Sequence, residues 1–191
     1  MHSHITTDWR RVLPAKPALL VLDFDGVLTD NRVYVHQDGT EIVCCSREDG
    51  LGVTLLRKRG FPIMILSTEV NPVVAARAAK LQVPCRSGVA DKTQAFAEIL
   101  TEEQVRAEDV VFVGNDVNDL GCLRAAGCGL VVADAHPRAK AAARGVLSKC
   151  GGQGAVREVC DALLEHLGLP GHFNDLDEIP QACRRVFEPA G

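Results

Sequence analysis

The stretch VLDFDGVLTD, residues 21–30, decides the fold, because an apolar run ends there in two acids, Asp23 and Asp25, with a glycine next. The longer run PALLVLDFD is continuously apolar up to the acids, which predicts a strand buried on both faces. Two carboxylates at the end of a buried strand repel each other and resist burial. A group elsewhere in the chain must therefore compensate their charge.

Further apolar runs alternate with helical patterns along the rest of the chain. Runs such as FPIMILS (61–67), DVVFVG (109–114) and CGLVVA (128–133) predict strands, and helix-period segments separate them. This alternation predicts an α/β doubly wound parallel sheet in one domain. The segments NRVYVH (31–36) and TEIVCCS (40–46), joined around Asp38 and Gly39, predict an inserted β-hairpin.

Polar side chains follow three of the predicted strands. Asp23 and Asp25 follow the first strand, and Ser67 and Thr68 follow the second. The third strand is followed by the stretch 115–119, which contains Asn115, Asp116 and Asp119. Lys92 stands at a predicted helix start. In such sheets functional groups gather at the carboxyl ends of the strands. Clustered acids need a cation, and oxygen ligands favour Mg²⁺, while a hydroxyl and a lysine beside it favour a phosphate. One carboxylate of the Asp-x-Asp pair can attack phosphorus and the other can protonate the leaving group.

Composition and charge narrow the function classes. The chain has 191 residues and a formal charge of −4 without a basic block, which argues against nucleic acid and anionic membranes as partners. No run reaches the ~18–20 apolar residues of a spanning helix, and the N-terminus lacks an apolar signal core, so we expect a cytoplasmic protein. The eight cysteines form no CxxC and no zinc-finger spacing, and we expect free thiols.

The motifs together resemble the haloacid-dehalogenase superfamily of phosphatases. The closer resemblance is to 3-deoxy-octulosonate-8-phosphate phosphatases and to the related domains found with CMP-sialic acid (acylneuraminate) synthetases. The resemblance covers residues 18–168, which leaves a polar leader at 1–17 and a tail at 169–191. The motifs that carry it are DFDGVLTD, DGLGVTLLRKRG, GVADK, VVFVGNDVNDL, VVADAHP and GGQGAVREVCD. The resemblance implies a Rossmann-like core with the hairpin insertion and no separate cap domain.

The resemblance also implies roles for the site residues. Asp23 would be the nucleophile that forms an aspartyl-phosphate, and Asp25 the general acid and then the general base. Mg²⁺ would be held by Asp23, the Asp25 backbone carbonyl and an acid of the GNDVND turn. Ser67 and Lys92 would bind phosphoryl oxygens. The resemblance further implies a homotetramer in which the hairpin helps to cover the active site of a neighbouring subunit.

Two departures from the octulosonate phosphatases bear on activity and substrate. They carry Asp-Asp where this chain has Asn115-Asp116, so either Asp116 supplies the metal-binding carboxylate or Mg²⁺ binds less tightly. They tend to have Gly-Arg where this chain has Thr68-Glu69. A Glu there resembles the phosphatases of sialic-acid-like 9-phosphates, in which the Glu and a Lys on the next helix read the sugar. Lys80 stands at the corresponding place, and Arg77 lies one turn before it; a solvated helix face is the alternative for both.

The leading hypothesis is therefore a Mg²⁺-dependent phosphatase of a 2-keto-3-deoxy sugar-acid phosphate, with a nonulosonate 9-phosphate favoured. Octulosonate 8-phosphate is the alternative substrate. A hypothesis from another class is a catalytically weak oligomerisation or regulatory domain partnered with a CMP-sugar-acid synthetase, which Asn115 permits.

Overall fold

The structure, a computed structural model, describes residues 8–172. Residues 1–7 and the tail from 173, which includes Cys183, lie outside the described part. The other seven cysteines are free thiols, as the sequence predicts.

One six-stranded parallel sheet organises the domain, in the order β5-β4-β1-β6-β7-β8. The strands are β1 (Leu19–Leu22), β4 (Ile63–Leu66), β5 (Cys85–Arg86), β6 (Val110–Gly114), β7 (Cys128–Val131) and β8 (Gly145–Val146). The predicted doubly wound α/β fold is confirmed. The central strand β1 lies between β4 and β6, and so the chain reverses its direction of winding at β1.

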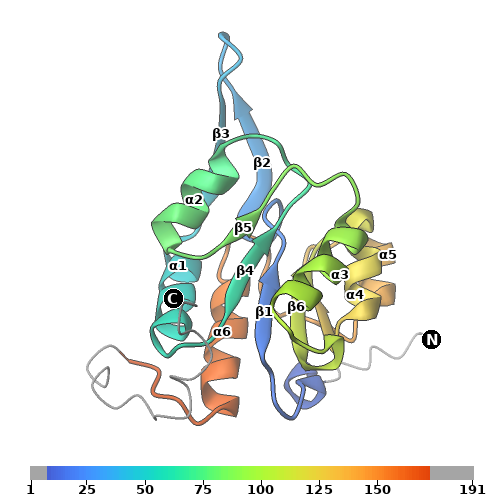
Figure 1. The fold of residues 1–191 in the computed structure, drawn as a ribbon. Helices are drawn as coiled ribbons and strands as arrows, with labels where there is room; N and C mark the ends of the chain where they lie inside the picture. Colours follow the sequence, from blue (N-terminus) through green and yellow to red (C-terminus); the bar gives the residue numbers. More distant parts are fainter. Residues whose placement is uncertain (1–7, 173–191) are drawn as a thin grey trace, which may run out of the picture.

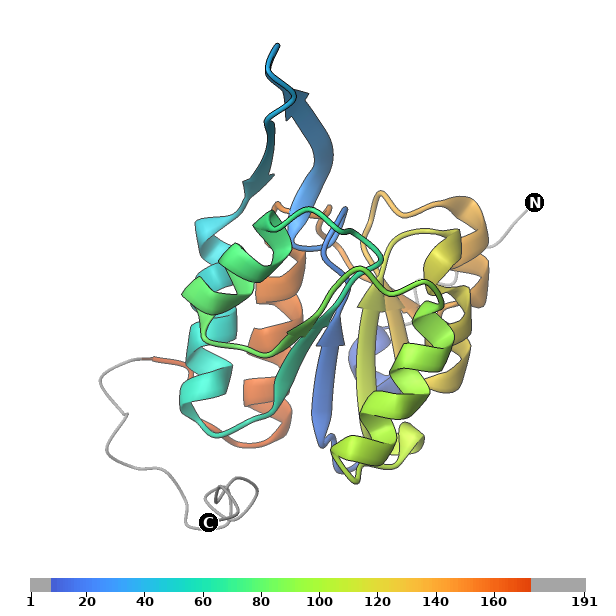
Figure 2. The same ribbon diagram turned by 45° about the horizontal axis from the view of Figure 1, so that its top comes forward.

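Helices cover both faces of the sheet. They are α1 (Arg47–Lys58), α2 (Val73–Leu81), α3 (Lys92–Glu102), α4 (Leu120–Ala125), α5 (Pro137–Ala142) and α6 (Ala155–His166). In both views α1, α2 and α6 lie on one side and α3, α4 and α5 on the other (Figures 1 and 2). Among the described residues, no helix is long and apolar enough to cross a bilayer.

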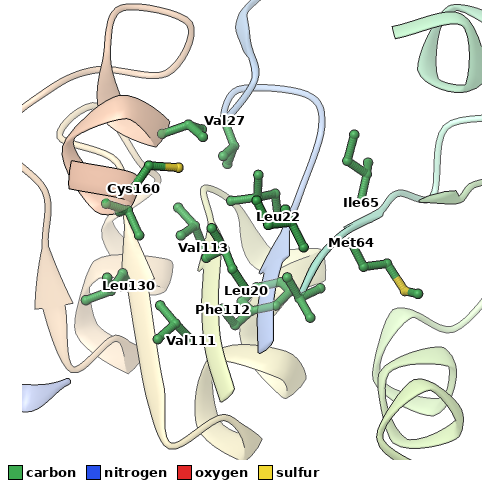
Figure 3. Close-up of a cluster of buried hydrophobic side chains, with 14 of the residues drawn as sticks. Leu20, Leu22, Val27, Met64, Ile65, Val111, Phe112, Val113, Leu130 and Cys160 are labelled. Atoms are coloured by element: carbon green, nitrogen blue, oxygen red, sulfur yellow. The ribbon is translucent and has the colours of Figure 1, made fainter. Parts of the chain in front are cut away.

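The core explains why the strands carry unbroken apolar runs. All four residues of β1, β4 and β7 are buried, and so are all five of β6. Figure 3 shows Leu20, Leu22, Val111 and Val113 of the central strands packed together with side chains from the neighbouring elements. A sheet with helices on both faces leaves these strands no solvated side, so alternation with polar residues is absent.

The predicted hairpin consists of β2 (Thr29–Val35) and β3 (Glu41–Cys45), which pair antiparallel. It projects from the end of the sheet toward which β1 points (Figure 2). Its apolar side chains Val33, Tyr34, Val35 and Ile42 are between 53% and 67% exposed. Four large apolar side chains exposed on one hairpin make it a candidate contact surface.

The N-terminal segment takes part in the fold more than its polar composition predicts. Trp9, in a short 3-10 helix (Trp9–Val12), is buried, and its Nε1 donates a hydrogen bond to Glu158 of α6 at 2.9 Å. The leader at 1–17 therefore supplies one core residue to the domain.

Asp49 of α1 caps a different helix. Its carboxylate is fully buried and accepts hydrogen bonds from the backbone N–H groups of Gly154 at 3.3 Å and Arg157 at 2.8 Å, at the start of α6. Burial raises the pKa of Asp49, and these N–H groups partly offset the rise. The first N–H groups of a helix have no partner within that helix, and Gly154 has no side chain that could accept from them. Asp49 of α1 therefore accepts their hydrogen bonds at the start of α6.

We expect Asp49→Ala to lower the free energy of unfolding by about 1–3 kcal/mol, because it leaves buried N–H groups unpaired. Urea denaturation followed by circular dichroism measures this. Asp161→Ala is the matched control: Asp161 is also an acid that contacts Arg157, but it is exposed and holds only the side chain. Equal destabilisation in the two variants would contradict the capping role.

Candidate active site

The carboxyl ends of the three central strands meet at one pocket. Leu22 pairs in register with Ile65 of β4 and with Val113 of β6, so the residues that follow these strands become neighbours. The pocket has a volume of about 270 Å³ and is lined by Asp23, Asp25, Asn31, Ser67, Thr68, Asn115, Asp116, Val117 and Asn118. The structure therefore brings together six of the residues predicted from sequence.

Lys92 does not line the pocket but contacts Asp23, which does. Its ammonium group is buried and donates to Asp23 Oδ1 and to Asp119 Oδ1, each at 2.7 Å. The Phe24 N–H also donates to Asp23 Oδ1, at 2.7 Å. Among the described residues no donor reaches Asp23 Oδ2, which leaves that oxygen available on the residue that lines the pocket. Lys92 thus orients Asp23 with one oxygen held and one unbound.

The site carries more buried negative charge than Lys92 neutralises. Burial, with Asp119 as the next contribution, raises the pKa of Asp23 to about 7, although the Lys92 ammonium opposes the rise. Burial of the Lys92 ammonium group lowers its pKa, but the charges of Asp23 and Asp119 and their hydrogen bonds to it outweigh that effect, so the pKa of Lys92 lies above its ordinary value. A further cation in the pocket would relieve the repulsion between the carboxylates.

Asp25 has a different environment from Asp23. It is half-buried, and desolvation raises its pKa, with the negative charges of Glu69 and Glu41 adding to the effect. A raised pKa keeps a proton on a carboxyl group longer, as a general acid requires. Glu69 itself turns back on its own loop, where Oε1 accepts from the Asn71 N–H at 2.7 Å. Asn71 Nδ2 in turn donates to Glu41 of the hairpin at 3.0 Å, so this loop connects the pocket to the hairpin.

The turn after β6 carries two acids, Asp116 and Asp119, in different environments. Asp119 is fully buried, and its Oδ2 accepts from the backbone N–H groups of Asn115 at 2.7 Å and Asp116 at 3.2 Å. With Oδ1 bound to Lys92, both of its oxygens are occupied. Asp119 therefore shapes the turn. Asp116 lines the pocket, and its Oδ1 accepts from the adjacent Val117 N–H.

Asn115 lies against the turn that follows Asp25. A Cβ added to Gly26, which has φ = +76°, would come within 1.9 Å of Asn115 Nδ2. Gly26 is therefore required both for its left-handed backbone and for the close approach of the Asn115 side chain. Asn115 lines the pocket and is almost entirely buried.

The donor set fits a hard divalent cation. Among the described residues no three His, Cys, Asp or Glu side chains form a ready metal site. Two carboxylates that line the pocket, Asp23 and Asp116, together with the Asn115 amide oxygen, are oxygen donors of the kind Mg²⁺ takes, and Mg²⁺ commonly keeps several waters. A cation bound beside Asp23 would lower the raised pKa of its carboxyl group.

Ser67 and Thr68 differ in exposure. Ser67 is 1% exposed, and its Oγ accepts from the Glu69 N–H at 3.0 Å, which leaves the hydroxyl proton free to be donated into the pocket. Thr68 is exposed, and its Oγ1 accepts from Asn118 Nδ2 at 3.4 Å. Ser67 is thus the better placed of the two for binding a phosphoryl oxygen.

Arg77 and Lys80 lie elsewhere. Both line a second cavity between α1 and α2, and neither lines the Asp23 pocket. Their predicted contact with a sugar stays a prediction.

Sequence reasoning missed three pocket residues, Asn31, Val117 and Asn118. Asn31 has φ = +62°, and an Asn directly after Asp30 was the available signal, because Asn tolerates the left-handed region better than most residues. The glycine loop 151–154 is bound to the segments that follow β1 and β7: the Gly152 N–H donates to the Val27 carbonyl oxygen at 3.0 Å and the Gly151 N–H to Asp134 Oδ1 at 3.0 Å.

Comparisons with known proteins identify relatives of this chain. A sequence model of the haloacid dehalogenase-like hydrolase family matches residues 86–158. The 3-deoxy-D-manno-octulosonate 8-phosphate phosphatase KdsC of Salmonella typhi is 36% identical over 147 residues, 76% of this chain and 78% of that protein.

Solved structures are similar over most of the chain. A haloacid dehalogenase family hydrolase from Streptomyces avermitilis is 46% identical with a TM-score of 0.77, covering 80% of this chain and 87% of that one. A 3-deoxy-D-manno-octulosonate 8-phosphate phosphatase from Moraxella catarrhalis, solved with magnesium, phosphate and KDO, is 28% identical with a TM-score of 0.78, covering 91% and 96%.

Proposed function

This chain belongs to the haloacid dehalogenase-like hydrolases and is a phosphoric monoester hydrolase, and we propose that it is a Mg²⁺-dependent phosphatase of a 2-keto-3-deoxy sugar-acid phosphate. The observation that carries the proposal is the pairing of Lys92 with Asp23 at the end of β1, beside Ser67 and Asp25. A nucleophile, a hydroxyl and a proton donor share one pocket there, and the Lys92 ammonium group contacts the nucleophile.

In the proposed reaction Asp23 attacks phosphorus through Oδ2 while Oδ1 stays bound to Lys92 and the Phe24 N–H. As the bond from phosphorus to the ester oxygen breaks, Asp25 transfers its proton to that oxygen, and the sugar acid leaves. Asp25, now ionised, takes a proton from water, which attacks the aspartyl-phosphate and releases phosphate. The raised pKa of Asp25 supports the first of these two roles.

Asp23, Asp116, Asn115 and the backbone carbonyl of Asp25 would hold Mg²⁺. When bound, the ion offsets charge on the carboxylate and on the phosphoryl oxygens, so that an anionic nucleophile can approach an anionic substrate. Ser67 and Lys92 would bind the remaining phosphoryl oxygens as a hydroxyl donor and a positive charge.

Two substrates remain candidates, each supported by one observation. The identity to KdsC phosphatases supports 3-deoxy-D-manno-octulosonate 8-phosphate. Glu69, whose negative charge adds to the raised pKa of Asp25, supports a nonulosonate 9-phosphate of the sialic-acid type, because a carboxylate there can accept hydrogen bonds from hydroxyl or amide groups of the leaving sugar. Phosphate release measured across a panel of sugar-acid phosphates with Mg²⁺ tests the function and separates the two.

We expect Glu69→Arg to lower kcat/KM on nonulosonate 9-phosphates about tenfold more than on octulosonate 8-phosphate, since an acceptor is replaced by a donor. Glu69→Gln is the control, because it keeps an oxygen for the Asn71 N–H and removes only the charge. An equal change on both substrates in Glu69→Arg would mean that Glu69 does not read the sugar.

The proposed assembly is a closed homo-oligomer, a homotetramer in the cytoplasm, built through the hairpin. The exposed Val33, Tyr34 and Ile42 support it, with Tyr34 paired across the strands to Ile42. Light scattering at micromolar protein should give an oligomer, and Ile42→Lys should shift it to smaller species. A monomeric parent would contradict this proposal and leave the phosphatase proposal intact.

The competing hypothesis is a catalytically weak regulatory domain that partners a CMP-sugar-acid synthetase. It predicts no phosphate release from any member of the panel at any Mg²⁺ concentration, which is the result that would overturn the proposed function.

A further inference from the structure

Arg59, which follows α1 directly, is the largest fully buried side chain among the described residues. Its Nε donates to the Pro170 carbonyl oxygen at 3.1 Å and its Nη2 to the His172 carbonyl oxygen at 2.7 Å. Its Nη1 is buried as well, but within residues 8–172 it has no hydrogen-bond partner, and Arg59 forms no ion pair there. A buried guanidinium without a carboxylate is costly, so we expect Arg59 to have a further partner.

The chain continues from Arg59 into an acidic stretch. His172, whose carbonyl oxygen Arg59 binds, is the last described residue, and the sequence continues as FNDLDEI, residues 173–179. This stretch contains the acids Asp175, Asp177 and Glu178. Three residues of extended chain span at most about 11 Å, so Asp175 is within reach of the guanidinium that holds His172.

An apolar cavity of about 400 Å³ lies close to Arg59 along the chain. Phe61, two residues after Arg59, lines it together with Met64 and Val83. The first residues of β1 and β4 also line it, so it lies at the edge of the sheet where these strands begin, opposite to the pocket with the acids. We call it the amino-edge cavity.

Arg57 is a second arginine with an unpaired donor at the amino-edge cavity, which it lines. Its Nη2 donates to Gln82 Oε1 at 2.7 Å, but its Nε is buried and has no hydrogen-bond partner among the described residues. Glu103 lines the cavity too, yet within residues 8–172 it forms no ion pair with Arg57. Apolar surface beside two guanidinium groups suits a segment in which acids and apolar side chains occur together.

We propose that residues 175–179 of the same chain dock at the amino-edge cavity, with a carboxylate of Asp175 or Asp177 bound to Arg59 and with Leu176 or Ile179 in the cavity. The occupant is the same chain, because Arg59 holds residues 170–172 at this end of α1. The inference goes beyond the proposed phosphatase function and does not depend on it, since none of the lining residues takes part in the proposed reaction steps.

Met64 offers a direct probe of the docked segment. It is 7% exposed, lines the amino-edge cavity and is one of only two methionines in the chain. In the full chain with ¹³C-labelled methionine methyl groups, NMR should show nuclear Overhauser contacts from the Met64 methyl group to a leucine or isoleucine methyl group that are lost in the double variant Leu176→Ser, Ile179→Ser. Val186→Ser is the matched control, because it removes an apolar side chain from the same tail outside the proposed segment, and it should leave the Met64 spectrum unchanged.

The charge contacts are tested by thermal unfolding of the full chain. Removing the three carboxylates together, by Asp175→Asn, Asp177→Asn and Glu178→Gln, should lower the unfolding midpoint by about 4–8 °C, as the loss of a hydrogen bond between charged groups does. In an Arg59→Met background the same triple substitution should leave the midpoint nearly unchanged, because its partner is gone. If Arg59→Met does not fold, the Met64 spectrum still tests the docking.

Three results would overturn the proposal. The first is a parent spectrum in which the Met64 methyl group has no contact that depends on Leu176 and Ile179. The second is a Met64 resonance that ignores the tail variants but shifts on dilution, which would assign the cavity to a second copy of the chain. The third is a loss of kcat/KM in the Leu176→Ser, Ile179→Ser variant with an unchanged Met64 spectrum, which would place the segment at the active site instead. The NMR measurement needs no turnover, so an inactive parent would refute the phosphatase proposal and leave this test intact.

Discussion

Asp23→Asn is expected to abolish phosphate release, with kcat lowered by roughly 10⁴-fold or more, because the substitution removes both the nucleophile and a charge that holds Mg²⁺. Asp25→Asn should lose the proton transfer alone, at a cost of ~10²–10⁴-fold. Steady-state assays with saturating Mg²⁺ measure both. In Asp25→Asn both the formation and the hydrolysis of the aspartyl-phosphate should be slowed, because Asp25 is the acid of the first step and the base of the second.

The stability of the Asp23→Asn variant is a control for this prediction. An Asn at this buried position keeps an oxygen that can accept from Lys92 and from the Phe24 N–H, so the substitution should not destabilise the protein. Thermal unfolding of Asp23→Asn should give a midpoint at or above that of the parent, and Asp161→Asn, at an exposed position on α6, should retain full activity. Near-parental turnover by Asp23→Asn would refute the mechanism.

Asp116→Asn is expected to abolish Mg²⁺-dependent turnover. Asp119 cannot replace it as a ligand, because its oxygens are occupied by Lys92 and by the N–H groups of Asn115 and Asp116. Without the Asp116 charge, Asp23 would be the only pocket carboxylate left among the proposed side-chain ligands, against the strong hydration of the ion. A Mg²⁺ titration of phosphate release measures the effect, and a titration curve equal to the parent's would contradict the ligand assignment.

Asn115→Asp is the companion variant, since it is close to isosteric and adds one charge at the same turn. It should lower the Mg²⁺ concentration that gives half-maximal rate, because total carboxylate charge attracts the ion. An unchanged or higher half-maximal concentration would show that Asn115 is not a ligand. If the parent is inactive at every Mg²⁺ concentration and Asn115→Asp restores turnover, the chain is a silenced phosphatase and the proposed function is wrong.

Much of the site was predictable because it follows from a rule about parallel sheets. Unbroken apolar runs predict the strands β1, β4 and β6, and a parallel sheet places the residues after them at one edge. Asp23, Ser67 and Asn115 therefore meet in one pocket as the sequence predicts. The strand β8 was not predictable, because two residues, Gly145 and Val146, are too few to show a period.

What the sequence by itself determined is the order of the elements, the parallel sheet and the identity of the residues at its carboxyl edge. Only the tertiary structure decided which atoms these residues contact. The hydrogen bonds from Lys92 to Asp23 and Asp119, from the N–H of Arg157 to Asp49 and from Trp9 to Glu158 join residues 27 to 149 positions apart. Periodicity reports on neighbours three or four residues away along a helix and two along a strand, so it carries no information about such contacts. The same limit applies to Arg77 and Lys80, which regular spacing places on one helix face. The packing of α2 against α1 decides that this face lines the cavity between the two helices and not the Asp23 pocket.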